Sequence, residues 1–377
     1  MVCQLERWRS KAQQVGMRRR VYNNRLMKTK KAAAKKLTIG LDLGDRHHHV
    51  CILDAAGEIV AREVIVNTPE VLSAFCARYR GATIVMETGT HSPWVSRLVA
   101  KLGLKVIVAN ARKLRAISES QTKNDEEDAE MLARLGRADP KLLSPVQHRS
   151  EGAQRGLVRL KVRDALVRSR VNAINTARFL LKSLGVFVSS SIKARAFTRK
   201  VRAQLAKEDC ALVEPLLAAV DAVNGQIKQL DVELETLARE RYPVTERLRQ
   251  IPGVGPLTAL CFVLTLESPE RFADARAAGP YLGLVPRRDQ SGESDKQLGI
   301  TKAGHVQMRC LLVNCAHYIL GPFGPPSHLR AAGERIAARG GKSAKKRAVI
   351  AVARKLAVTL LALWKSGADY EALPAAA

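Results

Sequence analysis

Four acidic residues in three separate segments have the types and spacing of a divalent-metal site. Asp42 lies in the apolar, strand-like run LTIGLDLG, and Glu87 ends a second such run in TIVMETG. Asp125 and Asp128 stand three residues apart in TKNDEEDAEMLARL, which has the pattern of a helix start, so they share one helix face. Paired metals held by carboxylates activate and stabilise oxygens in phosphodiester chemistry.

The residues around position 125 also have a purely structural interpretation. Asn124 or Asp125 can serve as an N-cap, and Glu126 and Glu127 are charges that the first turn of a helix favours. Asp42 has the sharper case, because a lone Asp in an apolar strand is costly to bury unless it is paired or metal-bound. Clustered carboxylates raise one another's pKa, so together they favour a bound Mg²⁺ or Mn²⁺.

The charge of the chain indicates a polyanionic partner. Its 377 residues include 63 Lys and Arg against 35 Asp and Glu, a net charge of +28. That excess is typical of proteins that bind phosphates and predicts a nucleic-acid partner. No segment approaches the roughly 18 apolar residues of a spanning helix, so no membrane is expected. Seven scattered cysteines without a CxxC pair predict a reduced, cytoplasmic protein without a zinc site.

Three consecutive histidines, His47 to His49, follow the first acid. They stand where a turn leads into a strand, so neighbouring side chains would point to opposite faces. We therefore favour a turn or a phosphate contact over metal ligation.

The elements around the acids predict an RNase H-like α/β domain. Three strands joined by tight turns are followed by alternating strands and helices. The expected strands are 37–43, 49–54, 58–66, 83–87 and 105–109, with a helix near 93–102.

Long helical patterns follow this domain. Apolar residues recur at helical spacing over 157–185 and 226–242, with heptad-like Leu and Val in the second. Two interpretations stay open, a coiled coil that forms a dimer seam and an intramolecular helical hairpin. The predicted domains are a basic arm at 1–36, the RNase H-like metal-binding domain at 37–150, a helical, coiled-coil-like linker at 151–245 and a mainly helical domain at 246–377.

The last domain contains two candidate phosphate contacts. The segment IPGVGPLTA is similar to the hairpin of a helix-hairpin-helix, in which Gly253 and Gly255 would let backbone amides approach a phosphate. A turn without function explains it equally well. The second candidate is Ser291 in RRDQSGESDKQLGITKAGH, a polar and basic segment between apolar helical stretches.

A serine hydroxyl in such a segment could attack a phosphodiester if nearby cations neutralise the phosphate. The candidate cations are Arg287, Arg288, Lys296 and Lys302. From composition alone the stronger interpretation is an ordinary Ser-Gly turn, and Ser294 is a competing nucleophile.

These motifs, taken in order, resemble the DEDD-type insertion-sequence transposases, which are bridge-RNA-guided serine recombinases. The resemblance covers roughly residues 37–365 and rests on IGLDLG, IVMETGTHSPWVSRLVAKLG, TKNDEEDAEMLARL, IPGVGPLTA and YLGLVPRRDQSGESDKQLGITKAG. It implies that Asp42, Glu87, Asp125 and Asp128 bind metal. It also implies that Ser291 forms a transient covalent link to a DNA phosphate. Where many relatives have Gly or a basic residue, this chain has Glu293.

The resemblance also implies partners: the element's DNA ends, a target DNA, and a structured noncoding guide RNA. It further implies a dimer or tetramer in which domains of different subunits form one composite site, in a bacterial cytoplasmic, nucleoid-associated protein. Two alternatives stay open. One is a metal-dependent junction nuclease in which Ser291 is structural, and the other is a non-catalytic nucleic-acid-binding remnant.

Overall fold

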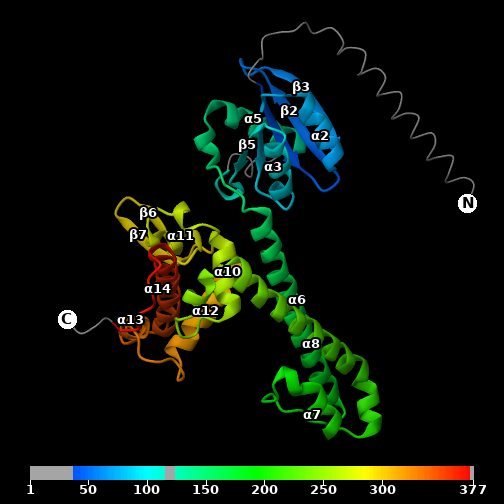
Figure 1. Cartoon of the computed structure of the whole chain (residues 1–377), viewed down its shortest axis with the longest axis vertical. Helices are drawn as coiled ribbons and strands as arrows, with labels where there is room; N and C mark the ends of the chain where they lie inside the picture. Colours follow the sequence, from blue (N-terminus) through cyan, green and yellow to red (C-terminus); the bar gives the residue numbers. More distant parts are fainter. Residues whose placement is uncertain (1–36, 115–123, 374–377) are drawn as a thin grey trace, which may run out of the picture. The chain divides into compact units, whose positions relative to one another are not determined.

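The computed structural model describes residues 37–114 and 124–373, so the basic arm predicted at 1–36 lies outside the described residues. The chain divides into two compact units, the first ending at His148 and the second beginning at Arg149 (Figure 1). Each unit is described by itself.

The first unit is built on a five-stranded mixed sheet with strand order β3-β2-β1-β4-β5. The first three strands form an antiparallel meander, whereas β4 and β5 run parallel to β1. The strands are β1 (Thr38–Leu43), β2 (His47–Leu53), β3 (Ile59–Val66), β4 (Thr83–Glu87) and β5 (Lys105–Ala109). The helices are α2 (Pro69–Arg78), α3 (Ser92–Lys101) and α5 (Asp125–Ala138), with short 3₁₀ turns η1 (Ala111–Lys113) and η2 (Pro140–Leu143). The RNase H-like α/β arrangement predicted from the sequence is confirmed.

Helices cover both faces of this sheet. Ile39, Leu41 and Met86 point to one face, where they share a core with residues of α2 and α3. Residues of the opposite parity point to the other face, where Val85 packs with Leu132 of α5. Side chains alternate between the two faces along a strand. Alternate residues of each strand therefore pack against α2 and α3 on one face and against α5 on the other.

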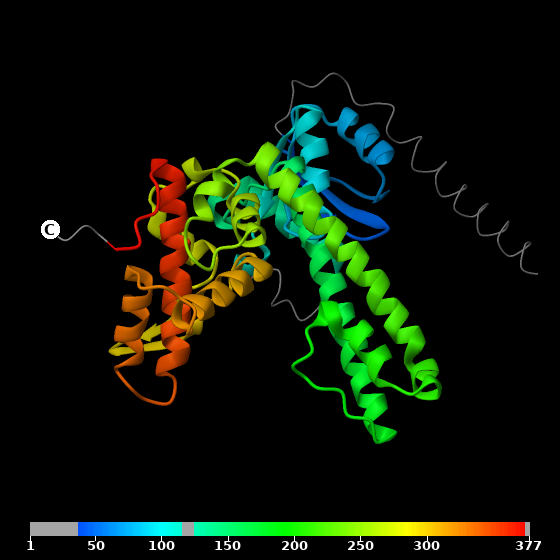
Figure 2. The same ribbon diagram turned by 60° about the horizontal axis from the view of Figure 1, so that its bottom comes forward.

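The second unit begins with two long helices that pack side by side, α6 (Glu151–Ser183) and α8 (Lys207–Arg241), as both Figure 1 and Figure 2 show. The short helix α7 (Phe197–Gln204), preceded by η3 (Ala194–Ala196), packs against α8. The two long helices therefore pair within one chain, as the interpretation of an intramolecular hairpin expects. The helix predicted at 226–242 begins much earlier, at Lys207, and continues through Pro215.

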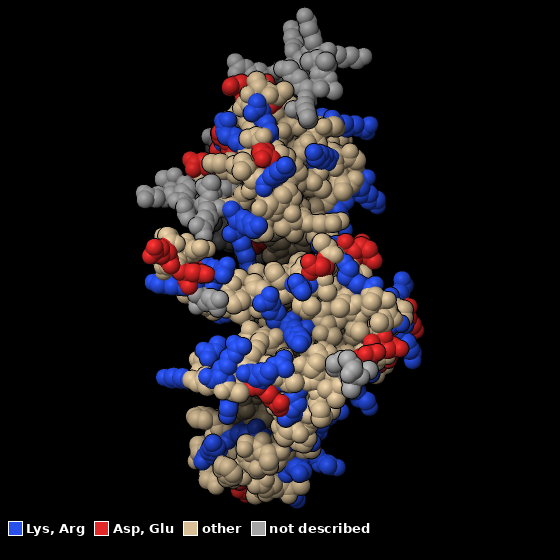
Figure 3. All heavy atoms as spheres, turned by 90° about the vertical axis from the view of Figure 1, so that its left-hand side faces the viewer, with Lys and Arg blue, Asp and Glu red and all other residues tan. Residues whose placement is uncertain are grey.

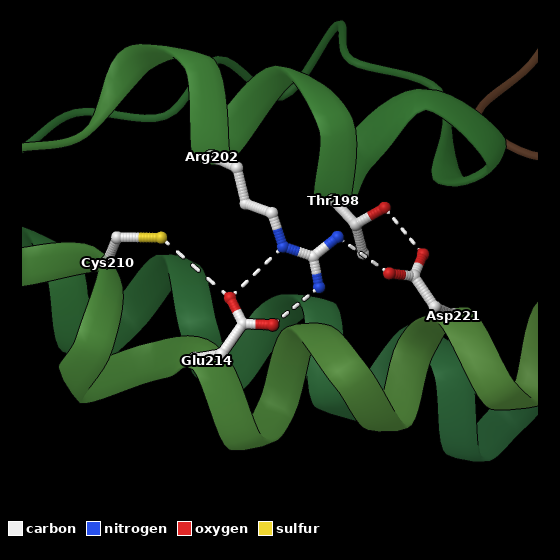
Figure 4. Close-up of polar contacts among 5 residues, drawn as sticks. All are labelled: Thr198, Arg202, Cys210, Glu214 and Asp221. Atoms are coloured by element: carbon white, nitrogen blue, oxygen red, sulfur yellow. Dashed lines mark hydrogen bonds and ion pairs between the residues drawn. The ribbon is translucent and has the colours of Figure 1, made fainter. Parts of the chain in front are cut away.

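A polar network joins α7 to α8 (Figure 4). The guanidinium of Arg202 donates to Glu214, with its Nη2 2.7 Å from Oε1, and to Asp221, with its Nη1 2.7 Å from Oδ2. Thr198 donates to the other oxygen of Asp221. The hydrogen bond from Arg202 lowers the pKa of Glu214.

The prediction that no segment is long and apolar enough to span a membrane is wrong. By length and composition, α8 contains a window apolar enough to cross a membrane. A single helix of this kind is weak evidence for a span, because packed helices of folded domains pass the same test. In this structure α8 packs against α6 and α7, and its carboxylates Glu214 and Asp221 pair with Arg202.

The rest of the second unit is mainly helical, as predicted, with one unforeseen hairpin. Its helices are α9 (Val244–Leu248), α10 (Pro256–Leu266), α11 (Ala278–Tyr281), α12 (Val306–Leu320), α13 (His328–Ala337) and α14 (Ala344–Ser366), with 3₁₀ turns η4 (Pro269–Arg271) and η5 (Ala275–Ala277). The buried helix α10 lies at the centre of the core, against α12 and residues of α14. The segment expected to interrupt the helices as a polar loop folds into two strands, β6 (Pro286–Ser291) and β7 (Ser294–Ile300).

Candidate functional site

Asp42 and Glu87 lie near the ends of neighbouring parallel strands. The pairing of β1 with β4 runs up to Leu41 opposite Met86, so the two acids follow directly at the same edge of the sheet. Alternate residues of a strand point to the same face of the sheet, so Asp42 shares the face of Gly40. Glu87 likewise shares the face of Val85, which packs against α5. Both carboxylates therefore point to the face that α5 covers.

A glycine brings α5 close to β1. A Cβ at residue 40 would lie 1.8 Å from the carbonyl oxygen of Ala129 and 2.7 Å from the amide nitrogen of Ala133. Only a residue without a side chain permits this approach. As a result, the first turn of α5 lies beside the end of β1 that carries Asp42.

That first turn supplies the other two predicted acids. Asn124 caps the helix, because its side chain accepts a hydrogen bond from the backbone N–H of Glu126 at 3.1 Å. Asp125 is therefore not needed as the cap. It is the first residue of the helix, and its side chain is exposed. Asp128 is half-buried one turn further along the same face.

The two acids of α5 act on the carboxyl of Asp42. Burial raises the pKa of the Asp42 carboxyl, and the charges of Asp125 and Asp128 raise it further. His49 and a backbone hydrogen bond at Leu43 oppose the rise. Carboxylate oxygens are hard donors, and acids that raise the pKa of a neighbouring acid fit a divalent cation. Within residues 37–114 and 124–373, no three acidic, His or Cys side chains are gathered tightly enough to ligate one ion.

The sequence analysis treated the three histidines as one group and did not single out His49. The three histidines lie in strand β2 and not in a turn, and His49 stands directly opposite Asp42 in the sheet register. Its Nε2 atom is 3.6 Å from Oδ2 of Asp125. Alternation along β2 places His49 on the face of Cys51 and Leu53, but its register with Asp42 cannot be read from the sequence.

Ser291 lies at the tip of the β6–β7 hairpin in the second unit. It pairs with Ser294 across a two-residue turn, Gly292-Glu293. Gly292 has φ +55, the left-handed conformation that favours glycine and suits a tight hairpin turn. The Ser291 side chain is exposed. The Ser-Gly pair therefore lies at a turn, as its composition predicts. That turn exposes the hydroxyl of Ser291 to solvent.

The basic residues near Ser291 are not equivalent. Lys296 stands opposite Asp289, two residues from the Ser291–Ser294 pair, so it shares the face of Ser291. Arg288 lies on the other face and pairs with Asp295 at 3.2 Å. Arg287 occupies an irregular position in the ladder, and Lys302 follows β7 with φ +55. Lys296 is therefore the best placed of the predicted cations to meet a phosphate at Ser291.

The GVG turn connects α9 to α10, as the helix-hairpin-helix interpretation expects. Gly253 has φ +94, and a Cβ there would lie 2.7 Å from the ring of Tyr318. Backbone conformation and packing therefore explain a glycine at this position without any contact to a phosphate. Gly255 is the N-cap residue of α10, and a Cβ there would meet nothing within 4 Å. Both glycines line a cavity of about 860 Å³ that also contains Arg195, Lys228 and Arg239.

Two family profiles match the chain. The profile of DEDD-type IS110 transposases matches residues 39–185, which include all four acids. The profile described as the transposase IS116/IS110/IS902 family matches residues 245–329, which include Ser291. Together they cover more than half of the sequence. The chain belongs to the IS110 family of transposases.

Curated relatives agree with this assignment. The transposase for insertion sequence element IS1111A of Coxiella burnetii is 26% identical over 302 residues, covering 78% of this chain and 81% of the relative. The transposase for IS1328 of Yersinia enterocolitica is 29% identical over 282 residues, covering 74% and 82%. The pilin gene-inverting protein of Moraxella bovis is 25% identical, covering 72% and 76%. The transposase is an enzyme of DNA phosphoryl transfer, and its DEDD family implies use of a divalent metal.

Proposed function

We propose that this IS110-family transposase is an RNA-guided serine recombinase in which Ser291 attacks a DNA phosphate and Asp42, Glu87, Asp125 and Asp128 hold Mg²⁺. The observation that carries the proposal is the exposed hydroxyl of Ser291 at the tip of a two-residue turn, with Lys296 on the same face. The shared orientation of the two strand-end acids toward α5 supports the metal role.

The serine step conserves the phosphodiester. The Oγ of Ser291 forms a bond to phosphorus, the bond from phosphorus to one sugar oxygen breaks, and the proton of the serine hydroxyl ends on that sugar oxygen. Attack by a sugar hydroxyl of another strand reverses the chemistry and releases Ser291, so no high-energy cofactor is consumed. A bound Mg²⁺ would neutralise charge that develops on the phosphate oxygens. Lys296 would hold the phosphate against Ser291.

The test is to trap a protein–DNA adduct on a denaturing gel with DNA that carries the element's ends. We expect Ser291→Ala to abolish the adduct. Ser294→Ala is the matched control, because Ser294 lies directly opposite Ser291 in the hairpin and is equally exposed. An adduct that survives Ser291→Ala but is lost in Ser294→Ala would identify Ser294 as the nucleophile.

A metal-only nuclease is the second candidate, because the acids and His49 are arranged without any contribution from Ser291. In that mechanism water replaces the serine. Cleavage that persists in Ser291→Ala but is lost in Asp42→Asn would establish it.

The guide RNA is proposed from the resemblance and from the net charge of +28. Co-purification from the native host followed by RNA sequencing tests it, since one discrete RNA is expected. The Moraxella relative is named for inverting a gene, and this accords with strand exchange rather than cleavage alone. We place the enzyme's action on DNA in the bacterial nucleoid and not at a membrane.

A dimer or tetramer is proposed from the paired helices. Several apolar side chains along α6 and α8 are exposed, among them Val158, Val162, Leu212 and Val232. Exposed apolar faces of long helices are typical of helix–helix association. Light scattering of the purified protein measures the number of subunits, and a monomer at all concentrations would contradict this proposal.

A further inference from the structure

A basic groove lies beside the base of the β6–β7 hairpin. Its volume is about 990 Å³, and it is lined by β6 and β7, α13 and α14, together with Arg276 of η5. Apolar side chains such as Leu298, Ile300 and Ile350 form part of its lining. Its charged residues are all cations: Arg276, Arg339, Lys346, Arg347, Arg354 and Lys355.

The six cations of the groove lack the carboxylate partners that several other cations of this unit have. In the described part of the chain none of the six forms an ion pair, whereas Arg202, Arg163 and Arg249 each pair with carboxylates. All six side chains are exposed. Figure 3 views the molecule from the side on which β6, β7, α13 and α14 lie in Figure 1, and Lys and Arg gather in patches across it. Unpaired like charges repel one another, so the groove favours a polyanion.

The spacing on α14 suits a phosphate backbone. Lys346 and Arg347 recur as Arg354 and Lys355 eight residues later, about 12 Å along the helix axis. One strand of duplex DNA advances about 3.4 Å per phosphate, so this stretch spans three to four phosphates. The groove has no aromatic lining residue on which a base could stack, so its contacts would be to the backbone and not to the sequence.

We propose that this groove binds the phosphate backbone of the DNA whose strand reaches Ser291. The inference rests on the proposed function, because it takes DNA as the occupant from the position of Ser291 on the same hairpin. Pro286 and Ile300 pair at the hairpin base beside the groove, and Ser291 lies five residues beyond Pro286. Five residues of strand extend about 17 Å, which corresponds to about five base pairs of duplex. The contacted phosphates therefore lie about five base pairs from the attacked one.

The test compares two triple variants of the full chain. The groove variant is Lys346→Gln, Arg347→Gln and Arg354→Gln. The matched control is Lys193→Gln, Arg199→Gln and Lys200→Gln, which removes equal charge from exposed positions at and before α7, also without ion pairs. Fluorescence anisotropy measures the Kd for a duplex carrying the element's end at salt concentrations from 50 to 200 mM.

We expect the groove variant to lower the slope of log affinity against log salt by about 2.7, close to 0.9 for each lost phosphate contact, and the control to lower it by less than 1. Equal slopes for the groove variant and the unaltered chain would overturn the proposal, as would an equal loss in both variants. A reduced slope for RNA with an unchanged slope for DNA would assign the groove to RNA and also overturn it. All the substituted side chains are exposed, and circular dichroism verifies that both variants are folded.

The outcome is separable from that of the proposed function. Groove binding is read from DNA affinity in the Ser291→Ala background, for which the proposed function expects no adduct. Should Ser291→Ala leave the adduct intact, the serine mechanism fails while the salt slopes still decide whether the groove binds DNA.

Discussion

At the scale of single residues, Asp42 combines a structural cost with a proposed functional role. Burial and the charges of Asp125 and Asp128 raise its pKa above the ordinary value of 3.8. A raised pKa in the folded state means that the stability contributed by protonation is fully present below pH 3.8. It is lost as the pH rises through the folded value, so ionised Asp42 destabilises the fold at neutral pH.

We therefore predict that Asp42→Asn raises the free energy of unfolding at pH 7 in metal-free buffer, and that the difference disappears below pH 3.8. The same variant should lose the stabilisation by Mg²⁺, which for the unaltered chain is about 2.7 kcal/mol at 100 times the Kd. Thermal unfolding with and without Mg²⁺ measures both effects. Glu126→Gln, an exposed neighbour in the first turn of α5, should keep the Mg²⁺ response. A destabilised Asp42→Asn protein at pH 7 would refute the argument.

His49 is predicted to position Asp125 for metal binding. Its Nε2 atom lies 3.6 Å from the Asp125 carboxylate, and it stands beside Asp42 in the register. Removal of a group that orients a ligand typically weakens metal affinity 10–100-fold, so His49→Ala should require about that much more Mg²⁺ for the same thermal shift. His47→Ala, an exposed residue of the same strand, is the control. An unchanged Mg²⁺ titration for His49→Ala would show that the contact has no such role.

At the scale of elements, the site depends on how closely α5 lies on β1. A methyl group at residue 40 would overlap the backbone of Ala129 and Ala133, and backbone cannot rotate away as a side chain can. We predict that Gly40→Ala destabilises the first unit by about 3 kcal/mol and moves the α5 acids away from Asp42. Urea unfolding and Mg²⁺ titration measure the two effects. Gly89→Ala, where nothing lies within 4 Å of the added Cβ, should do neither.

The β6–β7 hairpin is the other element that determines the proposed chemistry. Its turn needs Gly292 at φ +55, and its antiparallel register decides that Lys296, and not Arg288, shares the face of Ser291. Ion pairing of Arg288 with Asp295 makes the distinction sharper, because that guanidinium is already partly neutralised.

At the scale of the whole molecule, the net charge of +28 predicts a strong dependence of DNA binding on salt. A protein that contacts six to ten phosphates loses about 10³–10⁵ in affinity between 50 and 200 mM salt, because binding releases condensed counterions. Filter binding across that range measures the loss for the full chain. A flat response would contradict a nucleic-acid partner, since no other feature of the interaction would offset counterion release.

Local sequence patterns predicted most elements of the first unit and the order of the motifs. Short apolar runs predicted β4 at 83–87 and β5 at 105–109 with the bounds found, because strand patterns are local and buried runs are distinctive. The sequence also pointed to Asp42, because an acid in an apolar strand is conspicuous. It could not distinguish a cap from a ligand at Asp125. That distinction depends on the backbone geometry of Asn124.

Which residues meet in space could be learned only from the folded chain. The polar segment after Val285 carries weak strand propensity, and its pairing into a hairpin depends on cross-strand hydrogen bonds that a single segment does not reveal. The register that sets His49 opposite Asp42, and the packing that gathers six unpaired cations around one groove, join residues far apart in the chain. Such contacts follow from how the elements pack, and packing is a property of the whole fold and not of any local pattern.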